Sequence, residues 1–283
     1  MLDLVWAECD RVLMDGGFLC INIGDAVRTI NGNFMLYPNH SRIIGFFHSR
    51  GYSVLPDIHW RKPTNAPNKF MGSGMYPAGA YVTYEHEYIL IFRKGHKRIF
   101  ASDEAQRRRE SAFFWEERNM WFSDLWELPG ISQKNVGIVE RQKSAAFPIE
   151  IPYRLVNMYS IKGDTVLDPF CGCATTAMAC MASQRNSICV DINGSLIDLA
   201  LRKASLSEPA LNCLIDQRID RHEAFIRSLT EEKKAALYIN KPHGTMVKTK
   251  QEQELALYKI SEVNPHGNTV RCTYSPPQHF ASS

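Results

Sequence analysis

The segment Val166-Leu-Asp-Pro-Phe-Cys-Gly-Cys-Ala-Thr-Thr176 decides the fold of this chain. It predicts a strand that ends in an acid, a tight turn around Gly172, and a helix that begins at the two threonines. Glycine lets the backbone approach a ligand closely, and the N–H groups at a helix start favour an anionic or polar group. The segment therefore predicts a ligand site at the carboxyl end of a strand.

Strand and helix signals alternate around this turn. We expect strands at Thr165–Leu167 and Ser187–Val190, and helices at Thr175–Ser183 and Leu196–Ala204. A strand–turn–helix–strand order implies parallel strands whose faces are covered by helices. The fold class that follows is α/β, with a doubly wound, mostly parallel sheet.

Asp191 follows the second of these strands. In nucleoside-binding doubly wound folds an acid at this position accepts hydrogen bonds from a ribose. Capping of the next helix is the alternative role for this carboxylate. The spacing from Asp168 to Asp191 favours the ribose.

Apolar periodicity and turn residues predict the remaining elements. The N-terminal part contains helices at Leu2–Leu13 and Pro38–Arg50 and strands at Phe18–Ile23, Tyr52–Trp60 and Tyr88–Phe92. Further along lie the highly charged segment Lys97–Arg118, a helix within Lys143–Tyr159, a helix at Ile219–Leu229 and a strand at Thr269–Thr273.

The composition is that of a globular protein, with 45% hydrophobic and 22% charged residues among 283. The net charge is only +3, which is too small for the whole chain to bind nucleic acid by charge alone. Basic residues gathered on one face could still bind it. The sequence contains no apolar run of membrane-spanning length, and its acidic start does not resemble a signal peptide. We therefore expect a cytoplasmic protein.

The eight cysteines lack the spacing of a disulfide framework, so we expect reduced thiols. Cys171, Cys173 and Cys180 also lack the paired spacing of a zinc knuckle, and no metal is expected. A dinucleotide site would require G-x-G-x-x-G, but Ala174 and Ala177 occupy the later glycine positions. This argues against NAD or FAD, and the lack of a G-K-[ST] motif argues against an NTPase.

Four motifs, taken in order, resemble those of DNA methyltransferases that modify exocyclic amines. Asp168 to Thr176 resembles their D-P-F-x-G-[ST]-G-T-T cofactor motif, and Lys143-Ser-Ala-Ala-Phe-Pro148 resembles H-x-A-x-F-P. Arg11 to Gly17 resembles R-V-L-K-P-G-G, and Trp60-Arg-Lys-Pro63 with Glu85 to Lys94 resembles the strand pair that follows it. The Gly-Gly segment comes first, which is the permuted order of the β subgroup.

This resemblance implies S-adenosylmethionine as the cofactor. By position, Asp168 would contact its methionine amino group and Asp191 its ribose hydroxyls, while Phe147 and Pro148 would close over its methionine end. The other cofactor-binding candidates are Phe170, Gly172, Thr175 and Thr176. The chain departs from the motifs at Lys143, where the family has His, and at Ala174, where it has Gly. An alanine fits this turn only if its φ stays negative.

The resemblance also implies a division of the chain. Residues 1–205 would form the catalytic and cofactor domain, with an inserted target-recognition segment at 61–125, and residues 206–283 would form a C-terminal extension. Cations of the insert are the predicted DNA contacts, because an enzyme that extrudes a base must grip the duplex. They are Lys62, Lys69, Arg107, Arg108, Arg109 and Arg118, although a solvated helical face is the alternative for the arginine run.

Amino-methyltransferases carry a [DNS]-P-P-[YFW] tetrapeptide whose polar groups accept the amine's hydrogens while the aromatic ring stacks on a flipped-out base. In the permuted order it lies a few dozen residues before the Gly-Gly turn, but only 15 residues precede Gly16. The one Pro-Pro pair is in Ser275-Pro-Pro-Gln278, with glutamine in place of the aromatic residue. Ser275, Pro276 and Pro277 are therefore catalytic candidates, with a plain terminal turn as the alternative.

We expect the strand that leads to the tetrapeptide to lie between the strands at Val166 and Phe18. Without it the sheet would have a gap, which predicts a truncated or split enzyme that needs a second polypeptide. The leading functional hypothesis is methyl transfer to N4 of cytosine or N6 of adenine in double-stranded DNA, within a restriction-modification system. An inactive fragment that binds cofactor or DNA is one alternative, and a small-molecule or RNA methyltransferase is another.

Overall fold

The computed structural model describes residues 2–62, 71–72, 76–130 and 147–279. The chain divides into two compact units. The N-terminal unit comprises residues 1–99 and 123–131, and the C-terminal unit comprises residues 100–122 and 132–283. The predicted division at residue 205 does not coincide with these units, and the predicted insert 61–125 contributes residues to both.

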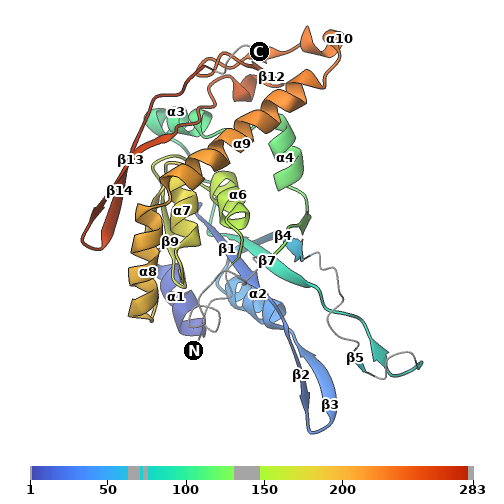
Figure 1. The fold of residues 1–283 in the computed structure, drawn as a ribbon. Helices are drawn as coiled ribbons and strands as arrows, with labels where there is room; N and C mark the ends of the chain where they lie inside the picture. The colour runs from blue at the N-terminus through green and yellow to red at the C-terminus, as the bar shows by residue number, and fades with distance from the viewer. Residues whose placement is uncertain (1, 63–70, 73–75, 131–146, 280–283) are drawn as a thin grey trace. The chain divides into compact units, whose positions relative to one another are not determined.

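The N-terminal unit contains the elements α1 (Leu2–Val12), β1 (Phe18–Ile23), β2 (Ala26–Ile30), β3 (Asn33–Tyr37), α2 (Asn39–Ser49), β4 (Ser53–Arg61), β5 (Met71–Gly72), β6 (Ala80–Tyr81), β7 (His86–Arg93) and β8 (Leu125–Glu127). Its main sheet has the strand order β1-β7-β4-β8 (Figure 1). Strand β7 runs antiparallel to both β1 and β4, so β1 and β4 share one direction, and their carboxyl ends lie at one edge.

Helices α1 and α2 cover one face of this sheet. Alternate residues of β1 and β7 point to that face, where Ile21 is paired with Leu90 in the antiparallel register. The core of the N-terminal unit consists of Trp6, Cys9, Ile21, Ile43, Phe47, Tyr52, Leu90 and Phe92. The predicted helices and strands of this half are therefore confirmed, with ends shifted by a few residues.

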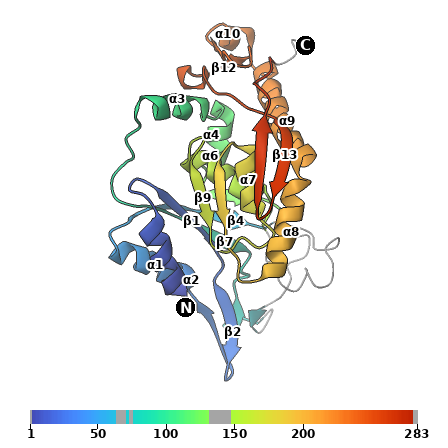
Figure 2. The same ribbon diagram turned by 90° about the vertical axis from the view of Figure 1, so that its left-hand side faces the viewer.

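Strands β2 and β3 form a hairpin that the sequence analysis missed. It extends beyond the sheet in both views (Figures 1 and 2). Its turn residues Asn31 and Gly32 have φ of 51° and 78°. Asn-Gly between two short apolar runs is a strong hairpin signal, because both residues tolerate positive φ. The signal was therefore present in the sequence.

The C-terminal unit contains α3 (Ser102–Glu110), α4 (Trp115–Trp121), α6 (Glu150–Tyr159), β9 (Thr165–Asp168), α7 (Thr175–Ala182), β10 (Asn186–Cys189), α8 (Gly194–Ser205), α9 (Glu208–Arg227), α10 (Glu231–Lys234), β11 (Tyr238–Ile239), β12 (Met246–Val247), the 3-10 helix η2 (Lys250–Glu252), β13 (Ile260–His266) and β14 (Thr269–Tyr274). Strands β9 and β10 pair in parallel, as predicted, with Leu167 opposite Ile188. Helix α7 packs against both β10 and α6.

The predicted C-terminal extension shares its core with the cofactor half. Helix α9 packs against α7, and the β13–β14 hairpin packs against α8 and α9. The core cluster combines Trp121, Tyr153, Ala179, Met181, Ala182 and Ala204 with Leu211, Leu214 and Ile260. Tyr274 at the end of β14 also donates its hydroxyl to the carbonyl of Met181 at 2.9 Å. Residues 206–279 are thus packed into the cofactor half.

The predicted α/β class is confirmed, and the sheet of the N-terminal unit is mixed because β7 is antiparallel to its neighbours. Among the described residues, β1 pairs only with β7 and β9 pairs only with β10. A strand between β1 and β9 stays a prediction. No helix in the described part of the chain is both long and apolar enough to cross a membrane.

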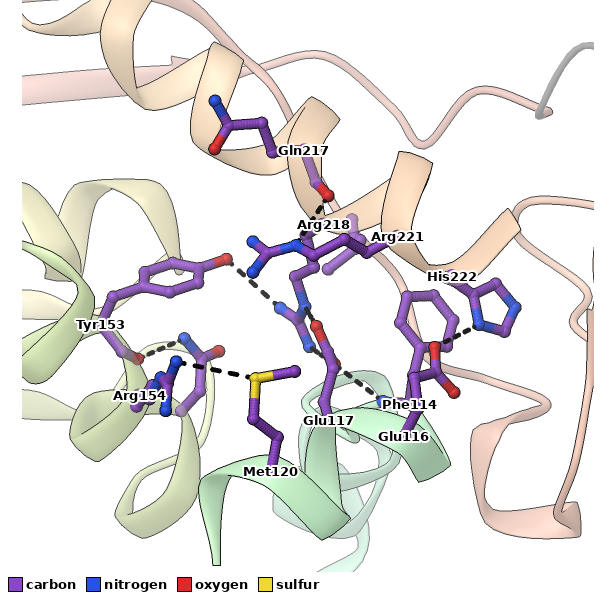
Figure 3. Close-up of polar contacts among 12 residues, drawn as sticks. Phe114, Glu116, Glu117, Met120, Tyr153, Arg154, Gln217, Arg218, Arg221 and His222 are labelled. Carbon is purple, nitrogen blue, oxygen red and sulfur yellow. Dashed lines mark hydrogen bonds and ion pairs between the residues drawn. The ribbon is translucent and has the colours of Figure 1, made fainter. Parts of the chain in front are cut away.

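A buried ion pair connects α4 to α9 (Figure 3). Arg218 Nη2 donates to Glu117 Oε2 at 2.8 Å, and Arg218 Nη1 donates to the hydroxyl of Tyr153 at 3.3 Å. The Arg218 side chain is 3% exposed and that of Glu117 10%. Next to this pair, buried His222 stacks on Phe114 and contacts Glu116. A polar network therefore fixes α4 against α9. Helix α4 belongs to the segment that the sequence analysis predicts to recognise DNA.

Replacing Glu117 with Gln should lower the free energy of unfolding by about 3–5 kcal/mol, because it leaves a buried guanidinium without a countercharge. Urea denaturation measures this change. Asp216→Asn on α9, the helix that carries Arg218, is the control. Asp216 forms an exposed pair with Lys259, so its replacement should cost at most about 1 kcal/mol. Equal effects of the two substitutions would contradict the buried role of Glu117.

Candidate cofactor site

The turn after β9 is held by two carboxylates. Asp168 ends the strand, and its Oδ1 accepts a hydrogen bond from the backbone N–H of Phe170 at 3.0 Å. Gly172 has φ of +48°, and its N–H donates to Asp191 Oδ2 at 3.0 Å. Only glycine adopts such a φ at little cost. The structure therefore brings Asp168, Gly172 and Asp191 together, as the sequence predicted.

Asp191 also holds the start of α8. Its Oδ1 accepts from the N–H of Asn193 at 2.8 Å. The helix cap itself is Asn193, whose side chain accepts from the N–H of Ser195 at 3.1 Å. The alternative role of Asp191 as the N-cap is therefore wrong. Each carboxylate oxygen of Asp191 uses one lone pair on the backbone and keeps another for a ligand.

The surface beside Gly172 is open. A Cβ added to Gly172 would meet no atom within 4 Å, so space alone does not demand glycine here. Thr175 and Thr176 begin α7 directly after the turn. Phe170 is 52% exposed, and Ile192, next to Asp191, is fully exposed. Exposed apolar side chains beside two acids are suited to a ligand with both a polar and a flat apolar part.

Ala174 adopts the backbone conformation that glycine favours. Its φ is +59° and its ψ 34°, in the left-handed region, at the N-cap of α7. The condition that φ stay negative at this alanine is therefore not met. The side chain is 4% exposed, so the surrounding packing holds Ala174 in this conformation. The sequence departure from glycine thus introduces backbone strain directly at the candidate site.

Phe147 and Pro148 precede α6, and the carbonyl of Pro148 accepts from the N–H of Ile151 at 3.1 Å. Because α6 packs against α7, these two residues belong to the same compact unit as the turn. Lys143, which replaces the His of the resembled motif, lies outside the described residues. The role of Phe147 and Pro148 at the cofactor stays a prediction.

The thiols around the turn are protonated at neutral pH. Burial raises the pKa of both Cys171 and Cys180 to about 12, and burial also raises the pKa of Cys189. A protonated thiol is a weak nucleophile, so these cysteines are unreactive at neutral pH. No group of three metal-ligating side chains occurs among the described residues.

The Ser275-Pro276-Pro277 segment directly follows β14 and has no regular secondary structure. The N–H of Ser275 donates to the carbonyl of Lys259 at 2.9 Å, and His243 Nδ1 contacts the carbonyl of Gln278 at 2.8 Å. A catalytic role for the segment stays a prediction, as does the plain-turn alternative.

The predicted DNA cations that the structure describes are divided between the two units. Lys62, in the N-terminal unit, pairs with Glu87. In the C-terminal unit Arg109 pairs with Glu254 at 2.7 Å. On the same helix, Arg107 donates to the carbonyl of Lys162 at 3.5 Å, and Arg108 lies over the ring of Phe100. Arg118, on α4, lies over the ring of Phe122. Lys69 lies outside the described residues. DNA contact by these residues stays a prediction.

Sequence reasoning missed a polar network in the N-terminal unit. Asn22 Nδ2 donates to Glu87 Oε2 at 2.7 Å, and Lys62 Nζ donates to Glu87 Oε1. These residues are far apart in the sequence and come together only through the pairing of β1, β7 and β4. The sequence offered one signal for this network, which is that Lys62 and Glu87 lie in the two segments that resemble the strand pair of amino-methyltransferases.

Replacing Ala174 with Gly should raise the free energy of unfolding by about 0.5–1 kcal/mol. A left-handed residue with a Cβ costs roughly 1–2 kcal/mol, and the greater freedom of glycine in the unfolded chain offsets about half of this. Ala177→Gly, inside α7, is the control and should lose about 1 kcal/mol. Thermal and urea unfolding measure both, and a loss of stability in Ala174→Gly would refute the strain.

Comparison with known proteins identifies the family of this chain. A family model described as "DNA methylase" matches residues 1–202. The type II methyltransferase M.MthZI of Methanothermobacter thermautotrophicus is 50% identical over 91% of this chain and 72% of its own length. M.MjaI of Methanocaldococcus jannaschii is 51% identical over 72% of this chain and 66% of its own length.

Solved structures agree with this assignment. The crystal structure of a candidate DNA modification methylase from Thermus thermophilus, complexed with S-adenosyl-L-methionine, covers 72% of this chain and 74% of its own length. The TM-score is 0.58 at 31% sequence identity. The family model covers most of the chain, and the relatives share half of their aligned residues with it. The chain therefore belongs to the DNA methylase family of N6- and N4-amino-methyltransferases.

Proposed function

We propose that this chain uses S-adenosylmethionine to methylate an exocyclic amine of DNA, N4 of cytosine or N6 of adenine. The observation that carries the proposal is the arrangement of Asp168, Gly172 and Asp191 at the carboxyl end of β9. In doubly wound folds this edge binds nucleoside ligands. The solved relative that contains S-adenosyl-L-methionine supports the same cofactor here.

The residues at the turn fit such a cofactor. S-adenosylmethionine has an ammonium group and ribose hydroxyls, which donate hydrogen bonds, and a flat adenine ring. Asp168 and Asp191 supply carboxylate acceptors, the second of which has free lone pairs on both oxygens. The exposed side chains of Phe170 and Ile192 supply apolar surface for a flat ring. When bound, the cofactor would supply an activated methyl group.

The contribution of this chain's residues is to bind and orient. The two backbone N–H contacts of Asp191 fix its carboxylate before any ligand arrives, so little ordering is needed on binding. Methyl transfer depends on holding donor and acceptor in line at short distance. A rigid Asp191 therefore supports a defined position for the methyl group.

The acceptor amine needs polar groups that take its hydrogens, because its lone pair is delocalised into the base. The 283 residues contain no [DNS]-P-P-[YFW] sequence. We infer that residues outside this sequence, on the same or on a second polypeptide, complete the acceptor side. In support, β1 and β9 each pair on one side only among the described residues. Since relatives are type II methyltransferases, we propose a restriction-modification role.

A direct test incubates the chain with labelled S-adenosylmethionine and unmethylated DNA, with and without a polypeptide that carries the tetrapeptide. We expect cofactor binding in both cases and methyl transfer when the tetrapeptide is present. Analysis of the digested DNA then identifies N4-methylcytosine or N6-methyladenine. Failure to bind the cofactor would refute the proposal, and binding without transfer in either case would favour the inactive fragment.

Asp191→Asn should weaken cofactor binding by about tenfold or more. An amide cannot accept both backbone N–H bonds and also present two acceptors to a ribose, and a hydrogen bond to a charged group contributes about 1.5–3 kcal/mol. Isothermal titration calorimetry with S-adenosylmethionine measures the change. Asp198→Asn, exposed on α8, is the control that should leave the affinity unaltered. Unchanged affinity in Asp191→Asn would remove this residue from the site.

A further inference from the structure

Three side chains from separate segments of the N-terminal unit share one carboxylate. Asn22 lies on β1, Glu87 on β7, and Lys62 directly follows β4. Asn22 Nδ2 donates to one oxygen of Glu87 at 2.7 Å, and Lys62 Nζ donates to the other. The carboxylate is thus fixed between an amide and an ammonium group.

A buried aromatic ring supports the ammonium group. Lys62 Nζ lies 4.3 Å from the centroid of the Trp60 ring. Trp60 is only 2% exposed, and its Nε1 donates to the carbonyl of Leu128 at 2.8 Å. The negative face of an aromatic ring attracts a cation. A hydrogen-bond donor and an acceptor are therefore held side by side in fixed positions.

The network has unused hydrogen-bonding capacity. An ammonium group has three N–H bonds and a carboxylate about four acceptor positions, so one ion pair saturates neither. The side chains of Lys62 and Glu87 are 40% and 26% exposed. Asn22 Oδ1 is buried and has no hydrogen-bond partner among the described residues. A polar ligand can therefore reach both charged groups.

The network lies where a ligand is expected. Strands β1 and β4 both run antiparallel to β7, so Asn22, near the end of β1, and Lys62, after β4, lie at the same edge. Ligands of open α/β sheets bind outside the carboxyl ends of such strands. An exposed ion pair contributes little to stability, at most about 1 kcal/mol, so stability alone gives little reason for this arrangement.

We propose that Glu87 and Lys62 read the Watson–Crick edge of the methyl-acceptor base, a role that rests on the proposed amino-methyltransferase function. Cytosine and adenine both present an amino donor beside a ring-nitrogen acceptor. Glu87 accepts from the amino group, and Lys62 donates to the ring nitrogen. In the same orientation, thymine and guanine would present a carbonyl to Glu87 and a ring N–H to Lys62, which sets acceptor against acceptor and donor against donor.

The test is binding of single nucleotides to the full chain by equilibrium dialysis, with dCMP, dAMP, dTMP and dGMP as probes. All four share the phosphate and sugar, so differences report on the base. We expect dCMP or dAMP to bind at least about fivefold more tightly than dTMP and dGMP, the size of discrimination that a well-placed donor–acceptor pair provides.

Glu87→Met and Lys62→Met remove the acceptor and the donor in turn at similar side-chain length, and each should abolish the preference. Arg61→Met and Glu127→Met are matched controls. They break the neighbouring exposed ion pair, whose charged atoms lie 3.0 Å apart, and these variants should retain the base preference. Glu87→Gln, closer in shape to the native residue, provides a second variant if Glu87→Met does not fold.

Equal binding of the four nucleotides, no binding of any, or a preference that survives both substitutions would overturn the proposal. Binding of S-adenosylmethionine is measured on the same protein and depends on Asp168 and Asp191, which belong to the C-terminal unit. An unsubstituted chain that binds the cofactor but shows no base preference would therefore refute the base reading alone. Loss of cofactor binding would refute the proposed function instead.

Discussion

The carboxylate of Asp191 is the contact on which the candidate site depends. It bonds the N–H of Gly172 in one strand-to-helix turn and the N–H of Asn193 in the next. It adds to the backbone bonds that join the same two segments, Cys171 N–H to the carbonyl of Val190 and Val190 N–H to the carbonyl of Asp168. Both α7 and α8 begin directly after the turns that Asp191 joins.

Much of this site could be predicted from the sequence, because its geometry is local. The acid, the glycine and the helix start lie within one turn, and Asp191 follows the next strand, so the periodicity of the chain was sufficient. The conformation of Ala174 could not be predicted, since an alanine alone does not indicate a positive φ. The network of Asn22, Lys62 and Glu87 was also missed, because it exists only after three strands have paired.

Charge patterns in the sequence were less informative than the strand pattern. The run Arg107 to Arg109 suggested a DNA-binding face, but consecutive residues on a helix point in different directions. The structure accordingly gives them three different contacts, one of them an ion pair with Glu254. The buried pair of Glu117 and Arg218 had no sequence signal, because its partners lie about a hundred positions apart.

Helix α9 and the β13–β14 hairpin lie beyond the residues that the family model matches, yet they pack into the same core as α7. The match to the family model ends at residue 202, yet Leu211, Leu214 and Ile260 fill the same core as Ala179 and Met181 of α7. A chain cut at the family boundary would leave this apolar surface in water and would tend to aggregate. Within the C-terminal unit, the matched residues and the segment that follows them therefore share one hydrophobic core and depend on each other for their burial.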